Sequence, residues 1–148
     1  MSETLIIRPI EPGDKEAWRA LWTAYLEFYE SSVSDAVYDA TFERLLSNND
    51  PDQNGFLAVM GDTPVGLVHY IYHAHNWRLD KVCYLQDLYA DPNVRGQGVG
   101  RKLIEAVYAR ADTDGCPSVY WLTQDFNAEA RKLYDRIANL TPFIKYAR

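Results

Sequence analysis

Three glycines alternate between a strand-like and a helical segment, and no other stretch restricts the possible fold as strongly. Residues 95–100 read Arg-Gly-Gln-Gly-Val-Gly, after an apolar, β-forming run at 82–89 and before a helical pattern at 102–111. Glycine lets the backbone turn sharply and approach a ligand, because no Cβ stands in the way. The first turn of the following helix carries free N–H groups and a partial positive charge. The segment therefore predicts a strand–loop–helix unit that binds a phosphate group.

Two common phosphate loops do not fit this segment. A Walker loop ends in Gly-Lys-Ser/Thr, whereas Gly100 is followed by Arg101 and Lys102, with no hydroxyl for magnesium. A dinucleotide fingerprint spaces its glycines as G-x-G-x-x-G, and the spacing here is G-x-G-x-G. The segment is therefore either a phosphate loop of another kind or a glycine-rich turn that binds no ligand.

Composition narrows the class of protein. The net charge of −6 argues against a nucleic-acid partner, which requires a basic face. No apolar run reaches the ~20 residues of a membrane span, and the first residues lack the layout of a signal peptide. Cys83 and Cys116 have no metal or redox spacing and are expected to be reduced thiols. We expect a single domain over residues 1–148, in the cytoplasm, with no membrane contact.

The order of elements predicts an α/β fold. Strands are expected at residues 4–9, 55–60, 64–72, 82–89, 118–123 and 143–146, and helices at 15–31, 35–47, 102–111 and 128–137. The segment 82–123 is long enough for a parallel crossover, whereas the strands before it form an antiparallel meander. We predict a mixed, mostly antiparallel twisted sheet, with a central parallel strand pair, flanked by helices.

The segment 95–100 resembles the Arg/Gln-x-x-Gly-x-Gly/Ala pyrophosphate loop of the GCN5-related N-acetyltransferase (GNAT) superfamily, and the order of elements is similar along essentially the whole chain. The resemblance implies the acyl-CoA N-acyltransferase fold, with acetyl-CoA as co-substrate. The cofactor-binding residues that it implies are Leu88, Tyr89, Ala90, Arg95, Gly96, Gln97, Gly98, Val99, Gly100, Arg101, Asn127 and Tyr134.

Two residues of the last predicted helix carry implied roles. Asn127 opens that helix and Tyr134 follows two turns later on the same face. In the family the matching Asn contacts the coenzyme arm and the matching Tyr lies near the thioester sulfur. A main-chain N–H of Leu88 or Tyr89 is the implied donor to the oxyanion. The alternative is that both residues have structural roles only, Asn127 as a helix cap and Tyr134 as a tyrosine in the core.

The general base is where the chain departs from the family pattern. Residues 84–89, Tyr-Leu-Gln-Asp-Leu-Tyr, look like the strand of polyamine acetyltransferases, where a Glu-Asp pair is usual. Gln86 takes the Glu position, and an amide cannot accept a proton at pH 7. The catalytic residues are thus predicted as Asp87 for the base and Tyr134 for the acid. A structural role for Asp87, a water chain, and the carboxylates of Glu27 or Glu30 remain alternatives.

In this family the first two helices usually wall the acceptor pocket. The substrate-binding residues expected from this are Tyr25, Phe28, Tyr29 and Gln86, and Tyr38 and Trp77 are further candidates for the pocket lining. An aromatic core between helices and sheet is the alternative for these rings. His69 is expected to be a packed or surface histidine. His73 and His75 have no evident third ligand, so no metal site is predicted.

The final predicted strand and the segment 119–123 look like the branch that contains polyamine and histone-tail acetyltransferases. That likeness implies a primary amine acceptor, namely a polyamine, a small amine or a lysine side chain, and a homodimer. Gln86 at the base position motivates one alternative, a coenzyme A-binding regulatory module without transfer activity. Transfer of a longer acyl group is another.

Overall fold

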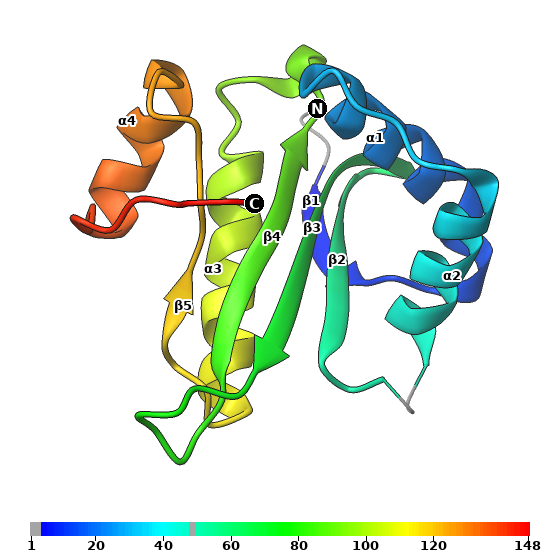
Figure 1. Cartoon of the computed structure of the whole chain (residues 1–148). Helices are drawn as coiled ribbons and strands as arrows, with labels where there is room; N and C mark the ends of the chain where they lie inside the picture. The colour runs from blue at the N-terminus through cyan, green and yellow to red at the C-terminus, as the bar shows by residue number, and fades with distance from the viewer. Residues whose placement is uncertain (1–3, 48–49) are drawn as a thin grey trace.

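The fold is built on one five-stranded sheet in the strand order β1-β2-β3-β4-β5 (Figure 1). A computed structural model describes residues 4–47 and 50–148. The strands are β1 (Leu5–Pro9), β2 (Gln53–Met60), β3 (Thr63–His73), β4 (Val82–Ala90) and β5 (Val119–Tyr120). All neighbours are antiparallel except β4 and β5, which run parallel at the edge of the sheet. The predicted mixed, mostly antiparallel fold is confirmed.

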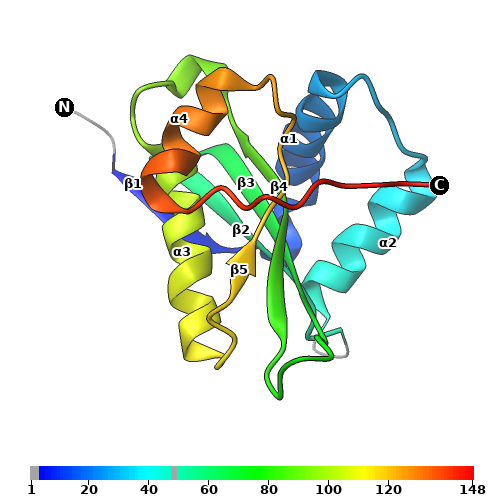
Figure 2. The same ribbon diagram turned by 60° about the vertical axis from the view of Figure 1, so that its left-hand side comes forward.

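Helices cover both faces of this sheet. They are α1 (Lys15–Phe28), α2 (Asp35–Leu46), α3 (Val99–Thr113) and α4 (Ala128–Ile137), with short 3₁₀ turns at Pro12–Asp14 and Pro92–Val94. Helices α1 and α2 lie on one face and α3 on the other, while α4 lies beside α3 beyond β5 (Figures 1 and 2). The Tyr108 hydroxyl donates to the Ile137 carbonyl oxygen over 3.0 Å, which ties α3 to α4.

Two buried clusters fill the space between these layers. The α3-face core joins α3 to β2, β3 and β4 and is mainly aliphatic, with Leu103, Ile104 and Val107 fully buried. The aromatic core joins α1 and α2 to the opposite face. Its buried members are Ile10, Trp18, Trp22, Tyr38, Phe42, Leu57, Val59 and Leu67. Helix α1 presents Trp18 and Trp22 one turn apart, so one helix face supplies most of this aromatic surface.

A β-bulge in β4 decides which face each of its side chains meets. His69 on β3 pairs with Asp87, and Tyr70 pairs with Leu85, so Gln86 is the extra residue. Leu85 and Leu88 therefore both contact the α3-face core although they are three positions apart. Strict alternation would have placed them on opposite faces. The bulge leaves Asp87 facing the helices α1 and α2, paired with His69.

The predicted final strand at 143–146 is wrong. Among residues 141–148 the structure has no strand, and Phe143, Ile144 and Tyr146 are 87%, 76% and 89% exposed. The tail instead crosses the outside of the sheet at an angle to β5 (Figure 2). β-forming side chains make a strand only beside a partner edge, and β5 pairs over two residues alone.

Several other element ends differ from the expectation, and among them α3 begins at Val99 and not at Lys102. The strand predicted at 118–123 is reduced to Val119–Tyr120, because β5 leaves β4 after the pair Tyr84–Tyr120. The helix predicted at 15–31 ends at Phe28, since Glu30 takes a left-handed backbone conformation with φ of +56°. No helix in the described part of the chain is long and apolar enough to cross a membrane.

Candidate active site

The glycine-rich loop turns the chain from β4 into α3. Gly96 and Gly98 have φ of +80° and +74°, in the left-handed region that favours glycine. A Cβ built on either residue would meet nothing within 4 Å, so open space lies beside both. Gly98 is the N-cap of α3, and its carbonyl oxygen accepts from the Lys102 N–H over 3.0 Å.

This geometry makes the start of α3 an anion site. The N–H groups of Val99, Gly100 and Arg101 precede the first intrahelical bond and have no partner within the helix. The positive end of the helix dipole lies at the same place. Arg95 and Gln97 are exposed on the loop, and the Arg101 guanidinium is paired with Glu105 over 2.8 Å.

Strands β4 and β5 separate on the way to this loop. Their ladder consists of the pairs Cys83–Val119 and Tyr84–Tyr120. The later part of β4, Leu88 to Ala90, is paired with β3 only, among the residues that the structure describes. Successive main-chain N–H groups of a strand point to opposite edges, so either Leu88 or Tyr89 directs its N–H toward the open side.

Helix α4 brings two predicted residues to the same end of the molecule. Asn127 occupies the N-cap of α4, yet its side chain makes no capping hydrogen bond. Tyr134 is half-buried, edge-on to the Trp121 ring at a centroid distance of 5.3 Å. Burial, with a smaller contribution from Tyr29, raises the pKa of the Tyr134 phenol to about 12. The phenol therefore keeps its proton near neutral pH.

Asp87 lies on the other side of β4, and its side chain is nearly enclosed. The residue is 8% exposed, and its Oδ2 accepts from His69 Nδ1 over 2.8 Å. Tyr25, Tyr29 and Tyr84 lie within electrostatic reach of the carboxylate, and the Tyr25 phenol also donates a hydrogen bond to it. Burial is the main cause that raises the pKa of each of these phenols, and the negative charge of Asp87 adds to it. Tyr29 thus lies within electrostatic reach of both Asp87 and Tyr134.

A cavity of about 370 Å³ opens between α1, α2 and the sheet. We name it the α1–α2 pocket; Trp22, His69, Gln86 and Asp87 are among its lining residues. Among the described residues that line it, Asp87 is the one carboxylate, and there is no Lys or Arg. Of the buried side-chain nitrogens and oxygens in the described residues, only Trp22 Nε1 lacks a hydrogen-bond partner.

The predicted aromatic residues lie partly elsewhere. Tyr25, Phe28 and Tyr29 form a contiguous ring cluster at the C-terminal end of α1, with centroid distances of 5.1 Å from Tyr29 to each of the others. Phe28 is 65% exposed. Tyr25 and Tyr29 lie within electrostatic reach of Asp87, but none of the three rings is part of the lining of the α1–α2 pocket. Tyr38 belongs to the aromatic core, where its hydroxyl shares a hydrogen bond with Thr23.

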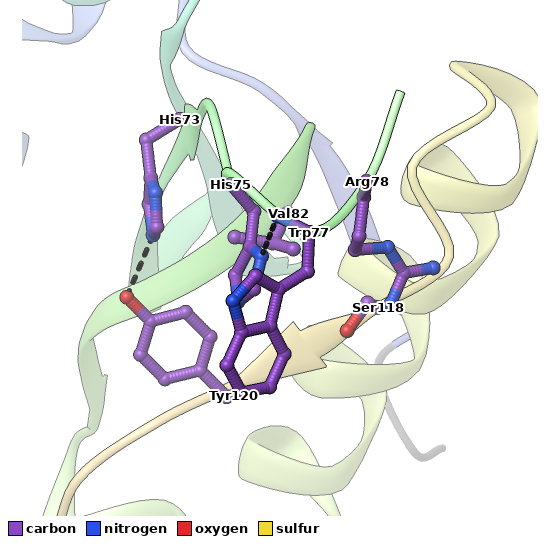
Figure 3. A pocket seen from close by; sticks show the side chains of 7 residues that line it. All are labelled: His73, His75, Trp77, Arg78, Val82, Ser118 and Tyr120. Atoms are coloured by element: carbon purple, nitrogen blue, oxygen red, sulfur yellow. Dashed lines mark hydrogen bonds between the residues drawn. The ribbon is translucent and has the colours of Figure 1, made fainter. Parts of the chain in front are cut away.

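Trp77 lines a second hollow, of about 610 Å³, at the opposite end of β4 (Figure 3). There the His73 ring makes a 2.8 Å hydrogen bond with the Tyr120 hydroxyl, and the main-chain N–H of Trp77 donates to His75 Nδ1 over 3.1 Å. The hollow lies beside Val82, where β4 begins, whereas the glycine loop follows its end. In the described ranges, no group of three or more His, Cys, Asp or Glu side chains could hold a metal ion.

Sequence reasoning missed His69 and the two tryptophans of α1. His69 was expected to be a packed or surface histidine, and the structure makes it a 4% exposed partner of Asp87 and Trp18. The only signal in the sequence is Gly55, which pairs with His69 across β2 and β3. A Cβ on Gly55 would lie 3.2 Å from the His69 ring, so the ring sits against a bare backbone.

Comparison with known proteins agrees with this geometry. The model of the acetyltransferase (GNAT) family matches residues 18–138. The chain is 38% identical over 152 aligned residues to the D-amino-acid N-acetyltransferase HPA3 of Saccharomyces cerevisiae, covering 100% of the chain and 92% of that protein. It is 31% identical over 90 residues to the thialysine N-epsilon-acetyltransferase of Caenorhabditis elegans, covering 60% and 56%.

The fold is also that of solved acetyltransferases. The aminoglycoside N-acetyltransferase AAC(6')-Iy, solved in complex with CoA, superposes with a TM-score of 0.86 at 20% identity. That superposition covers 100% of this chain and 96% of the other chain.

Proposed function

The chain belongs to the acetyltransferase (GNAT) family and is an N-acetyltransferase with acetyl-CoA as co-substrate, and we propose that it acetylates a primary amine directly, within one domain over residues 1–148. This proposal rests on one observation, that two complementary features lie on opposite sides of β4. An open anion site at the start of α3 suits the coenzyme, and an enclosed carboxylate, Asp87, suits an amine.

The coenzyme is proposed to bind through main-chain groups. Its pyrophosphate would accept from the N–H groups of residues 96–101, beside Arg95, where Gly96 and Gly98 leave space for it. The pantetheine arm would then run between β4 and β5, along Leu88 to Ala90, with the Asn127 amide holding it from α4. The β4 N–H on the open side would donate to the acetyl oxygen as it becomes an oxyanion.

The acceptor has to lose a proton before it reacts. A free alkylamine has a pKa of about 10.4, so deprotonation at pH 7 requires roughly 4.6 kcal/mol. We propose that Asp87 takes this proton, directly or through one water. The amine lone pair then forms the N–C bond, which leaves the nitrogen positively charged. The nitrogen loses its second proton to solvent, the C–S bond breaks, and the sulfur leaves with the electron pair as a thiolate. The products are an acetamide and coenzyme A.

Tyr134 is proposed to stabilise the leaving thiolate by a hydrogen bond. A thiol has an ordinary pKa of about 8.5, and the pKa of Tyr134 is raised to about 12. Complete proton transfer from Tyr134 to the thiolate would therefore be unfavourable by about 5 kcal/mol. A strong hydrogen bond needs no such transfer, so Tyr134 acts as a donor and the thiolate gains its proton from solvent.

Two features favour amino acids over polyamines as acceptors. The unpartnered Trp22 Nε1–H, in the lining of the α1–α2 pocket, offers a hydrogen bond to an oxygen near the reacting amine. A polyamine has no such oxygen, whereas an amino acid has a carboxylate. The relatives are named as a D-amino-acid and a thialysine N-acetyltransferase, and both names specify amino acids.

The test is acetyl-CoA-dependent thiol release with a panel of D-amino acids, lysine, thialysine, lysine peptides, small amines and spermidine. Acceptor-dependent release, fastest with amino acids, is the expected result. Tight acetyl-CoA binding without release for any amine would favour the regulatory module instead. Propionyl-CoA and succinyl-CoA in parallel reactions measure the acyl preference, and faster release with either would replace acetyl transfer.

We further propose a homodimer in the cytoplasm. The exposed Phe143, Ile144 and Tyr146 form an apolar segment that a second copy would cover. Both cysteines, Cys83 and Cys116, are buried free thiols, which is compatible with a reducing compartment. Light scattering on the purified protein measures the mass directly, and a monomer at micromolar concentration would contradict the dimer.

A further inference from the structure

Three buried side chains from three elements form a continuous polar connection. Trp18 on α1 donates its Nε1–H to His69 Nε2 over 2.9 Å, and His69 Nδ1 lies 2.8 Å from Asp87 Oδ2. Trp18, His69 and Asp87 are 0%, 4% and 8% exposed. We call this connection the Trp18–His69–Asp87 chain.

The order of donors along this chain is determined by Trp18. An indole nitrogen donates only, so His69 Nε2 has to accept and cannot carry a proton. In a neutral imidazole the proton is then on Nδ1, which donates it to the Asp87 carboxylate. Protonation of Nε2 would direct two N–H groups at each other inside the aromatic core. Trp18 therefore favours the neutral, Nδ1–H form of His69.

We propose that His69 is a positioning residue, fixed in its neutral Nδ1–H form by Trp18, that orients the Asp87 carboxylate without placing a positive charge beside it. This inference rests on the proposed role of Asp87 as the base. A cation next to a carboxylate favours its ionised form and makes it a weaker base. A neutral N–H holds Oδ2 in place without this effect, so the carboxylate keeps its basicity toward the acceptor.

The surroundings of the chain leave this arrangement undisturbed. Tyr25 and Tyr29 from α1 and Tyr84 from β4 face Asp87, and raised phenol pKa values keep all three uncharged near neutral pH. The Trp22 ring lies against His69 at a centroid distance of 5.4 Å. Among the ion pairs of the described residues, His69 is the one partner of Asp87, and no Lys or Arg reaches it.

The first experiment reads the imidazole itself and needs no turnover. The protein is labelled with ¹⁵N-histidine, and the ring nitrogen shifts of its three histidines are measured at neutral pH. The signals missing from His69→Asn belong to His69. We expect these signals to be those of a neutral Nδ1–H ring. In Trp18→Phe, which lacks the indole donor, the signals should move away from this form. An Nε2–H or doubly protonated ring in the unsubstituted protein would overturn the proposal.

The second experiment compares two substitutions of His69 by kinetics. His69→Asn keeps an N–H for Asp87 and cannot become charged, whereas His69→Leu provides no donor. We expect His69→Leu to lower kcat at least 10-fold with the KM for acetyl-CoA within 2-fold of the original. His69→Asn should recover most of that loss. Equal losses in the two variants would show that His69 only fills space.

The third experiment uses the pH profile. Trp18→Phe should lose more kcat/KM on acidification than the original protein, because without the indole donor His69 Nε2 can take up a proton. The double variant Trp18→Phe/His69→Asn lacks the titrating ring and should not show this extra loss. Phe42→Leu is the matched control, because the Phe42 ring packs on the Trp18 ring at a centroid distance of 5.1 Å and has no polar atom that could hydrogen-bond to the chain. The Phe42→Leu variant should unfold more easily than the original protein, with the same dependence of kcat/KM on pH. A Trp18→Phe profile parallel to that of Phe42→Leu would contradict the proposal, and absence of acetyl transfer in every protein would contradict the proposed function alone.

Discussion

The two faces of the sheet are built from different chemistry. On the α3 face, aliphatic side chains pack from β2, β3 and β4 onto one helix, and the polar groups offered to a ligand belong to the main chain of the glycine loop. On the opposite face, the rings of α1 and α2 enclose a histidine and an aspartate. Strand β4 has side chains on both faces, as any strand does. The bulge at Gln86 decides which of its residues point to each face.

This difference has a functional consequence. A site made of main-chain N–H groups depends on backbone conformation and tolerates many side chains. A site made of buried side chains depends on each hydrogen-bond partner, since an unpaired polar group in a core is costly. We therefore expect substitutions on the α3 face to change the affinity for acetyl-CoA, and substitutions on the aromatic face to change turnover.

Asp87→Asn should have the largest effect. An amide cannot accept a proton, so kcat should fall by about 10²–10⁴-fold, the usual contribution of a general base. The dissociation constant of acetyl-CoA, measured by calorimetry, should stay within 2-fold. Glu27→Gln and Glu30→Gln are the matched controls, because both carboxylates are exposed on or after α1. A large loss of kcat in either control, with Asp87→Asn active, would move the base to α1.

Tyr134→Phe should have the next largest effect. A hydrogen bond to a charged group contributes about 1.5–3 kcal/mol, so kcat should fall roughly 10- to 100-fold. The pKa of Tyr134 is raised, which favours its protonated form, so the phenol ionises only as the pH approaches about 12. The ratio of the two kcat values should therefore be constant between pH 6 and 10. A ratio that changes within this range would show that Tyr134 titrates in the reaction.

The α3 face was predictable from sequence because its determinants are local. Gly96, Gly98 and the helix after them are contiguous, and their backbone requirements appear as residue types in fixed order. The strand β4 and the helix α4 were likewise indicated by periodicity within single segments. Such patterns depend on neighbours a few residues away, which a single sequence displays.

The aromatic face was not predictable in the same way. Trp18 and His69 are 51 positions apart, and nothing in either segment announces the other. The orientation of Asp87 depends on the bulge at Gln86, which shifts the alternation of β4. The strand predicted at 143–146 failed for a related reason, because its β-forming residues need an edge to pair with. Long-range partners decide all three cases.

Two glycines allow the comparison of faces to be tested by adding one methyl group to each. A Cβ on Gly66 would lie 2.8 Å from the Tyr89 carbonyl oxygen and 3.0 Å from Val99, at the start of α3. A Cβ on Gly55 would lie 2.8 Å from Ile10 Cδ1, 3.0 Å from the Val68 carbonyl oxygen and 3.2 Å from the His69 ring. Each alanine should lower the free energy of unfolding by about 1–3 kcal/mol, because the sites are already full.

The two alanine variants should differ in kinetics although their stability losses are similar. Gly66→Ala displaces the start of α3 and should weaken acetyl-CoA binding. Gly55→Ala displaces the His69 ring and should lower kcat at saturating acetyl-CoA. Thermal unfolding, calorimetry and steady-state rates are measured on both proteins. If both variants change the same kinetic parameter, the division of labour between the faces is wrong.

Asp14→Asn should have the smallest effect and should change stability alone. Arg8 donates to both Asp14 oxygens over 2.7 and 2.9 Å, and the Glu11 N–H donates to Oδ2 over 2.7 Å. The hydrogen bonds from Arg8 are the main cause that lowers the pKa of Asp14. The stabilisation, about 1 kcal/mol, is therefore present at neutral pH and lost as the pH falls below the ordinary value of 3.8. The free energy of unfolding in urea is measured for the original protein and the variant at pH 7 and pH 3, and the difference between the two proteins should be smaller at pH 3. Both kcat and the affinity for acetyl-CoA should be unchanged in the variant at pH 7. A kinetic change in Asp14→Asn would mean that general loss of stability, and not the face on which a residue lies, governs both affinity and turnover.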